Sequence, residues 1–169
     1  MSTDHIPAPS PIALQPGGGE ALWFMGFLAT IKAGADGTAG RVAVIHHLGP
    51  QDAGSPLHVH HREDEWFYVL DGALTFWVGD SCLSLKAGSF AFGPKGVPHT
   101  FYAKAGGAQA LIEFAPMQFE RFQKEVDKPA LERVVPPPAK GHPDMARLAP
   151  IAKRNGFEIL GPPGPPPGH

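Results

Sequence analysis

Cysteine is almost absent from this sequence, which has only Cys82 among its 169 residues. One cysteine forms no disulfide within the chain, and it cannot build a metal site from several thiolates. We therefore expect a protein of a reducing compartment and predict a cytoplasmic location. Cys82 itself is expected to be a small packed side chain.

The chain also lacks a strong net charge and a long hydrophobic run. Fourteen Lys and Arg residues stand against sixteen Asp and Glu residues, which gives a net charge of −2. This balance predicts no basic surface and therefore no nucleic-acid partner. The apolar stretch 21–31 is too short to cross a bilayer, so we expect a strand there and no membrane insertion.

Helical periodicity is missing before Met117. The chain instead shows short runs of β-type residues separated by many of its 21 glycines and 20 prolines. Such strands predict an all-β sandwich or small barrel in a single domain. The pair Asp71-Gly72 is a strong tight-turn signal, which makes the run after it a return strand. The eight predicted strands are 22–31, 41–48, 66–70, 73–78, 82–85, 90–92, 100–103 and 108–114.

Changes in composition divide the chain into four expected segments. Helical spacing appears late, where Phe119, Phe122 and Val126 are three and four residues apart. A second helix is expected at 143–155, with Pro150 as a kink. The expected segments are a flexible N-terminal arm at 1–19, a β-barrel at 20–116, a C-terminal helical extension at 117–160 and a Pro/Gly-rich tail, disordered or polyproline, at 161–169.

One stretch, from Pro56 to Gly72 (PLHVHHREDEWFYVLDG), carries most of the residues with metal-binding chemistry. His58 and His60 are two residues apart, so on a strand their imidazoles face the same side. Glu65 has the wrong parity for that face on one unbroken strand. The polar run 61–64 predicts a turn that resets the parity and brings Glu65 to the histidines.

A second stretch, from Gly88 to His99 (GSFAFGPKGVPH), supplies a third histidine after a turn rich in Gly and Pro. Three imidazoles and one carboxylate suit first-row transition metals, whereas Ca²⁺ and Mg²⁺ prefer oxygen ligands. We therefore predict one divalent transition metal ion, Mn, Fe, Co, Ni, Cu or Zn. The predicted ligands are His58, His60, Glu65 and His99.

Other residues compete for roles at this site. Asp64 is the rival of Glu65, but Glu65 has the longer side chain and begins the alternating apolar face of its strand. His46 and His47 are adjacent on a predicted strand and must face opposite sides, so one of them is expected to line the cavity without binding metal. His61 is expected in a turn, and no role is expected for His5, His142 and His169.

The two stretches resemble the two sequence motifs of the cupin superfamily. The first motif, H-x-H followed by a carboxylate and a glycine, is matched by His58, His60, Glu65 and Gly72. The second, G-x5-P-x-G-x2-H-x3-N, is matched by Gly88, Pro94, Gly96 and His99, with Ala103 in place of the final Asn. The resemblance implies a double-stranded β-helix, the cupin jelly-roll barrel, followed here by two short C-terminal helices.

Within the cupins, residues 34–122 are similar to small single-domain proteins related to bacterial quercetin 2,3-dioxygenases. This similarity implies a metal-dependent dioxygenase that cleaves a flavonol-like or other small aromatic or enolic substrate with O2 and, for a flavonol, releases carbon monoxide. Glu65 would then be catalytic, as metal ligand and general base. The alternatives are a non-catalytic, metal-dependent cupin that binds a small molecule, and a metal-dependent isomerase or decarboxylase. An exposed sheet edge and a loose arm favour a homodimer.

Overall fold

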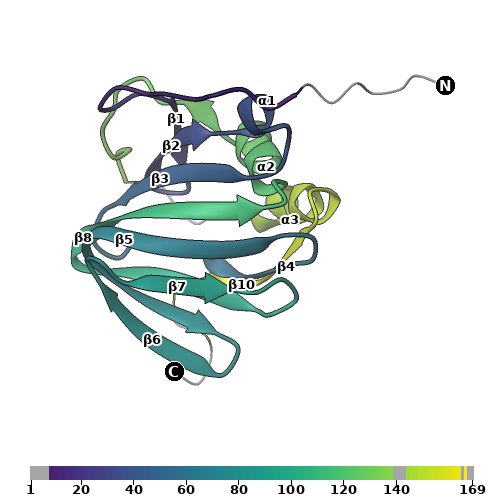
Figure 1. Cartoon of the computed structure of the whole chain (residues 1–169). Coiled ribbons are helices and arrows are strands. Elements are labelled where there is room, and N and C mark those ends of the chain that lie inside the picture. The colour runs from purple at the N-terminus through teal and green to yellow at the C-terminus, as the bar shows by residue number, and fades with distance from the viewer. Residues whose placement is uncertain (1–7, 139–143, 165, 167–169) are drawn as a thin grey trace.

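The computed structural model describes residues 8–138, 144–164 and 166 and consists mainly of β-strands (Figure 1). The all-β jelly-roll fold with short C-terminal helices predicted from the sequence is confirmed. The strands are β1 (Glu20–Phe24), β2 (Phe27–Ala33), β3 (Ala43–Gly49), β4 (Pro56–His60), β5 (Asp64–Val78), β6 (Ser81–Lys86), β7 (Phe90–Gly93), β8 (His99–Ala115), β9 (Lys128–Pro129) and β10 (Phe157–Pro163). The helices are α1 (Ala35–Thr38), α2 (Phe119–Val126) and α3 (Met145–Arg154).

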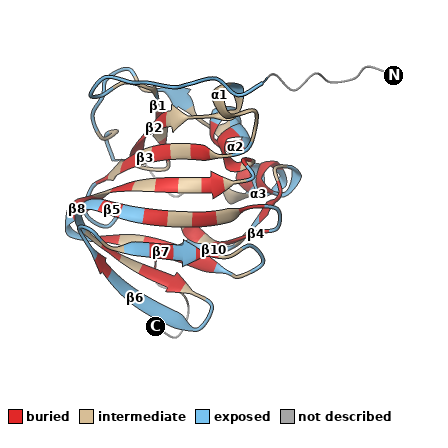
Figure 2. Ribbon diagram, viewed as in Figure 1, coloured by how far each residue is buried: buried red, intermediate tan, exposed pale blue. Residues whose placement is uncertain are grey.

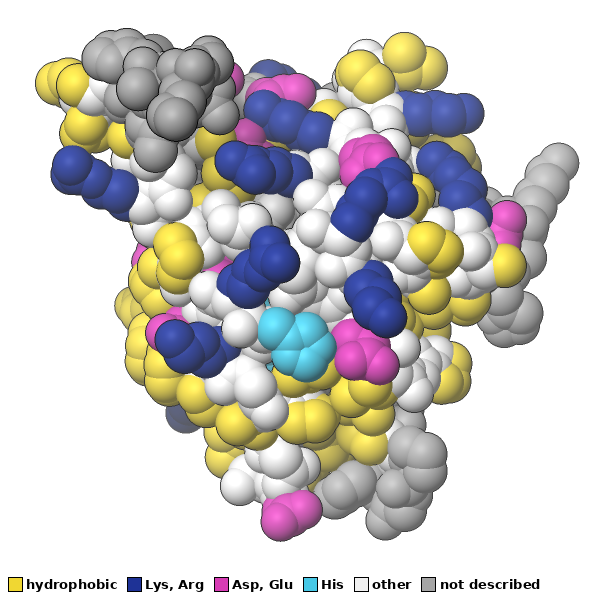
Figure 3. Space-filling model, turned by 90° about the vertical axis from the view of Figure 1, so that its right-hand side faces the viewer, with side chains coloured by type: hydrophobic (Ala, Val, Ile, Leu, Met, Phe, Trp, Pro, Cys, Tyr) yellow, Lys and Arg dark blue, Asp and Glu magenta, His cyan; other side chains and the backbone are white. Residues whose placement is uncertain are grey.

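Two long strands, β5 and β8, form the centre of the barrel. They pair antiparallel along both halves, 64–72 with 108–115 and 74–78 with 99–103. The strand order through β8 is β10-β4-β8-β3-β2-β1-β9. β5 pairs with β8 outside this path and also pairs with β6 and β7. Helices α2 and α3 lie together at one end of the barrel (Figure 1). Figure 3 faces this end, where Lys and Arg side chains are spread between acidic and apolar ones.

Alternation along the strands places the core inside the barrel. β3 alternates strictly between buried and half-buried residues, as a strand with one face in the core should (Figure 2). Side chains from several strands are almost fully enclosed, and the apolar faces of α2 and α3 cover them at one end. The largest apolar side chains among the enclosed ones are Ile45, Phe67, Val69, Phe76, Ile112, Phe114, Met117 and Phe122.

The tight turn predicted at Asp71-Gly72 is wrong. β5 continues through this pair and bends there, with register shifts against β8 between Val69 and Asp71 and between Gly72 and Leu74. The segment 73–78 is therefore the second half of the same strand. The predicted strands 100–103 and 108–114 likewise belong to one bent strand, β8. Gly72 therefore lies at a corner of the barrel, where β5 and β8 bend together, and not in a hairpin turn.

Replacing Gly72 with alanine is expected to lower the free energy of unfolding by about 2 kcal/mol or more. Gly72 has φ +72°, and a Cβ atom there would lie 2.2 Å from the carbonyl oxygen of Gly107. Gly88→Ala is the matched control, because Gly88 has φ +85° with no atom near its would-be Cβ. Chemical denaturation should show a larger loss for Gly72→Ala, and equal losses would mean that the close approach of β5 and β8 is unimportant.

Other boundaries also differ from those predicted. The expected strand 22–31 is a hairpin, β1–β2, because Met25 and Gly26 have φ values of 47° and 90° and reverse the chain. The expected tail 161–169 begins inside β10, an edge strand paired with β4, where prolines are tolerated. The rest of that tail, except 164 and 166, and residues 1–7 of the arm lie outside the described residues.

Three further predictions can be compared with the structure. Helices were expected at 117–126 and 143–155, and α2 and α3 lie within these ranges, with Pro150 inside α3. Cys82 is exposed on β6, which corrects the expectation of a packed side chain. Within the described residues, no helix is both long and apolar enough to cross a membrane.

Candidate metal centre

Three strands bring the four predicted ligand residues to one place inside the barrel. His58 and His60 lie on β4, Glu65 is the second residue of β5, and His99 is the first residue of β8. His58 and His99 are direct partners in the β4–β8 pairing. The chain leaves β4 at His60 and enters β5 at Asp64, so the predicted break between the strands exists and Glu65 faces the histidines.

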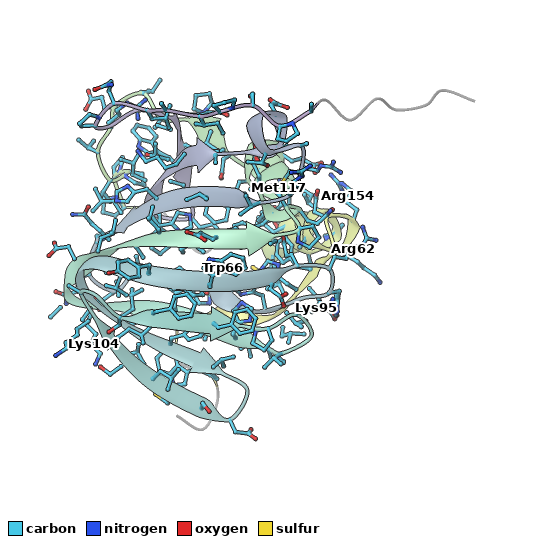
Figure 4. All side chains as sticks on the ribbon, viewed as in Figure 1. Arg62, Trp66, Lys95, Lys104, Met117 and Arg154 are labelled. Atoms are coloured by element: carbon cyan, nitrogen blue, oxygen red, sulfur yellow. The ribbon has the colours of Figure 1, made fainter. Side chains whose placement is uncertain are left out.

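Side-chain alternation on β5 keeps Glu65 inside. Glu65 is 3% exposed, whereas the next residue, Trp66, lies on the outer face and donates its indole N–H to Glu113 (Figure 4). Arg62 and Lys95, from the loops beside His60 and His99, lie at the same end of the barrel as α3, and Lys104 lies at the other (Figure 4). The cluster therefore sits near the end of the barrel that the helices cover.

The four side chains converge on one small volume. One ligand atom from each lies within 4.8 Å of all the others, and all four residues are buried. Glu65 Oε2 is 3.6 Å from His58 Nε2, 3.2 Å from His60 Nε2 and 2.7 Å from His99 Nε2. Asp64, the rival ligand, points elsewhere and accepts a hydrogen bond from the backbone N–H of Lys95.

The outer nitrogen of each imidazole is held by an acceptor. Nδ1 of His58 donates to the carbonyl of Pro56 at 2.7 Å, and Nδ1 of His99 donates to the carbonyl of Val97 at 2.9 Å. Nδ1 of His60 lies 2.7 Å from Glu63 Oε1. A ring that is neutral with its proton on Nδ1 directs the lone pair of Nε2 toward Glu65.

This donor set fits a metal ion. Three imidazole lone pairs and a carboxylate facing one another repel, and a cation among them offsets that repulsion. His60 Nε2 has no hydrogen-bond partner among the described residues, although it is buried. Burial alone would lower the pKa of His60, but contacts with Glu63 and Glu65 raise it to about 9. The pocket thus favours positive charge, whether a proton on His60 or a metal ion.

Glu65 is arranged to remain ionised. Its burial would raise the pKa of the carboxyl, but the surrounding imidazoles of His58, His60 and His99 hold the pKa well below its usual range. Burial lowers the pKa of His58 to about 4, which keeps this imidazole neutral at pH 7. A neutral imidazole and an ionised carboxylate are the protonation states that metal binding requires.

Glu63 is a site residue that the sequence analysis missed. Its side chain is 1% exposed. Besides the contact with His60, Glu63 Oε2 accepts hydrogen bonds from the backbone N–H groups of Gln118 and Phe119, at 2.8 and 3.2 Å. Glu63 therefore links a predicted ligand to the start of α2. The only local signal was an acid three residues after His60, and the polar run around it was interpreted as a turn.

Replacing Glu63 with glutamine is expected to weaken metal binding about 10- to 100-fold, because carboxylates that orient ligand histidines contribute this much to affinity. Competition with a chromophoric chelator measures the effect. Glu158→Gln is the control, because Glu158 is an exposed carboxylate 3.4 Å from the exposed His61. Unchanged affinity in Glu63→Gln would show that His60 needs no such support.

A cavity adjoins the cluster and contains about 490 Å³ of space, part of it open to solvent. His58 and Glu65 form part of its wall. Five phenylalanines from β1, β2, β8, α2 and β10 form much of the remaining wall, namely Phe24, Phe27, Phe101, Phe119 and Phe157. The aromatic lining suits a flat, largely apolar compound.

The adjacent histidines of β3 face opposite sides, as predicted. His47 is buried and lines the cavity. His46 is half-buried on the other face, where its Nε2 lies 3.2 Å from Gln109 Oε1. Neither belongs to the four-residue cluster. His61 lies in the break between β4 and β5, whereas His5, His142 and His169 lie outside the described residues.

Comparisons with known proteins agree with this geometry. Residues 44–112 match the family model described as a cupin domain, Cupin_2. Quercetin 2,3-dioxygenase of Bacillus subtilis (strain 168) is 26% identical over 126 residues, which are 75% of this chain and 37% of that protein. The chain therefore spans little more than a third of the length of this curated relative.

Solved structures show the same fold. KdgF from Halomonas sp. has a TM-score of 0.57 and 17% identity, over 66% of this chain and 99% of that one. Oxalate decarboxylase from Bacillus subtilis has a TM-score of 0.55 and 22% identity, over 68% of this chain and 31% of that one. The family match over residues 44–112, the jelly-roll fold and the buried His/Glu cluster together support a cupin domain that is similar to the quercetin 2,3-dioxygenases.

Proposed function

We propose that this cupin is a metal-dependent dioxygenase that cleaves a flavonol-like or other small aromatic or enolic substrate with O2. The observation that supports this most is that the buried three-histidine, one-glutamate cluster forms part of the wall of an aromatic cavity. His58, His60, Glu65 and His99 would hold one divalent transition metal ion. When bound, such an ion would supply Lewis-acid chemistry to an ionised hydroxyl compound and, if it is redox-active, one-electron chemistry with dioxygen.

The protein contributes binding, exclusion of water and a proton acceptor. The phenylalanines of the wall would bind the flat faces of the substrate and displace water from the buried cluster. Glu65, ionised and buried, would accept the hydroxyl proton of the substrate on Oε2. A carboxylate within the ligand cluster is within hydrogen-bond reach of a hydroxyl that binds there. Ring cleavage of a flavonol then yields an ester and carbon monoxide.

Aerobic turnover of quercetin tests the proposal. The protein is stripped of metal and reconstituted separately with Mn, Fe, Co, Ni, Cu or Zn, and both flavonol loss and carbon monoxide are followed. At least one metal is expected to give catalytic loss with one carbon monoxide per flavonol. Tight metal binding without turnover would contradict a flavonol dioxygenase. Ligand binding without O2 consumption would indicate a non-catalytic cupin, and products formed without O2 would indicate an isomerase or decarboxylase.

A further inference from the structure

One polar side chain of the cavity wall, His47, does not belong to the cluster and pairs with a buried residue outside the wall. His47 of β3 and Gln123 of α2 meet with 3.3 Å between their Nε2 atoms. Their residues are 5% and 0% exposed. The ring of His47 stacks against Phe24 and Phe27, with centroids 6.3 and 5.6 Å away. His47 therefore sits among phenylalanines in the cavity wall, and Gln123 contacts it from outside that wall.

The hydrogen bonding of this pair is incomplete. His47 Nδ1 and Gln123 Oε1 are both buried and have no hydrogen-bond partner among the described residues. Burial lowers the pKa of His47 to about 4, so the ring is neutral at pH 7 and carries one N–H. A buried polar group that stays unpaired is destabilising, and most buried polar groups in native proteins have a partner from the protein or from ordered water. A bound ligand could supply the missing partner here.

The chemistry of the missing partner follows from the two possible amide orientations. If Gln123 Nε2 donates to His47 Nε2, the proton of the ring is on Nδ1, which needs an acceptor. If the amide is turned over, Gln123 Oε1 accepts from His47 Nε2, and Nδ1 needs a donor. A hydroxyl group serves in both cases, because it can accept or donate. A carbonyl or an ammonium group serves in only one.

We propose that His47, oriented by Gln123, binds a hydroxyl group of the substrate that is remote from the oxygens at the metal centre. This inference rests on the proposed function and makes it more specific. The substrate class becomes a flat aromatic compound with one metal-binding oxygen pair and at least one further phenolic hydroxyl. His47 then determines specificity, because a polar site discriminates against analogues that leave it unpaired.

Binding of two matched flavonols tests the subsite without turnover. Zn²⁺-loaded protein under anaerobic conditions is titrated with quercetin and with 3-hydroxyflavone, which retains the hydroxyl–carbonyl pair but lacks the remote hydroxyls. Wild-type protein is expected to prefer quercetin about 10-fold or more. The His47→Phe variant keeps an aromatic ring between Phe24 and Phe27. In this variant the affinity for quercetin should fall about 10-fold, and the affinity for 3-hydroxyflavone should fall less than 3-fold.

A second variant and a spectroscopic readout separate binding from folding. Gln123→Leu removes the group that orients the ring and should reduce the preference for quercetin in the same direction. In wild-type protein, the ¹⁵N resonance of His47 Nδ1 should shift with quercetin and not with 3-hydroxyflavone. That readout does not depend on either variant folding.

Several outcomes would overturn the subsite. If the affinities of His47→Phe for the two flavonols fall equally, or if neither falls, the pair only supports packing between β3 and α2. An Nδ1 resonance that responds equally to both flavonols would do the same. If wild-type protein binds both flavonols without preference, the subsite fails and the dioxygenase proposal stands. If it binds neither, the flavonol proposal itself fails, and the subsite fails with it.

Discussion

Replacing His99 with alanine is expected to reduce bound metal from about one ion per chain to almost none after dialysis, a loss of affinity greater than about 100-fold. His99 is fully buried, its ring is fixed by the carbonyl of Val97, and its Nε2 is the imidazole nitrogen nearest to Glu65 Oε2. Removing it takes away one of the four predicted ligands.

Elemental analysis of dialysed protein measures this effect, with circular dichroism to check that the variant is folded. His46→Ala is the control, because His46 lies on the outer face of β3 and does not belong to the cluster. The control should retain its metal. Full metal content in folded His99→Ala would contradict the four-ligand assignment.

Replacing Glu65 with glutamine is expected to reduce turnover about 10²- to 10⁴-fold, while most of the metal is retained. The amide has the same shape and still offers an oxygen to the metal, but it cannot accept a proton. The pKa of Glu65 is held well below its usual range by the histidines around it, so the native side chain is available as a base at neutral pH.

The turnover rate should be expressed per bound metal ion, so that a lower metal content is not mistaken for a slower reaction. Asp64→Asn is the matched control. Asp64 is the adjacent carboxylate and lies outside the cluster, where it accepts a hydrogen bond from the backbone of Lys95. The control should keep wild-type turnover per metal. Wild-type turnover in metal-loaded Glu65→Gln would exclude Glu65 as the proton acceptor.

The cluster was predictable because its signals are local. The spacing of His58 and His60 places both on one face of a strand. The polar run after them indicated the break between two strands that turns Glu65 toward the histidines. Alternation along β3 likewise placed His46 and His47 on opposite faces. These predictions needed only the period of a strand and the position of one turn.

Features that depend on distant partners were missed or wrong. β10 pairs with β4, which is almost a hundred residues earlier in the chain, and no local pattern indicates that pairing. Glu63 acquires its role from α2, more than fifty residues later. Asp71-Gly72 has the composition of a hairpin turn, but pairing with β8 on both sides keeps β5 continuous. Tertiary pairing decided each case.

Reaction under ¹⁸O2 is the most direct test of the central proposal. Metal-loaded protein is incubated with quercetin in labelled dioxygen, and the ester product and the carbon monoxide are analysed by mass spectrometry. Cleavage by a dioxygenase in which the carbon monoxide carries the original hydroxyl oxygen of the flavonol predicts two labelled oxygen atoms in the ester and none in the carbon monoxide. Products that form at the same rate without label would contradict the dioxygenase and assign the cluster to chemistry that does not consume O2.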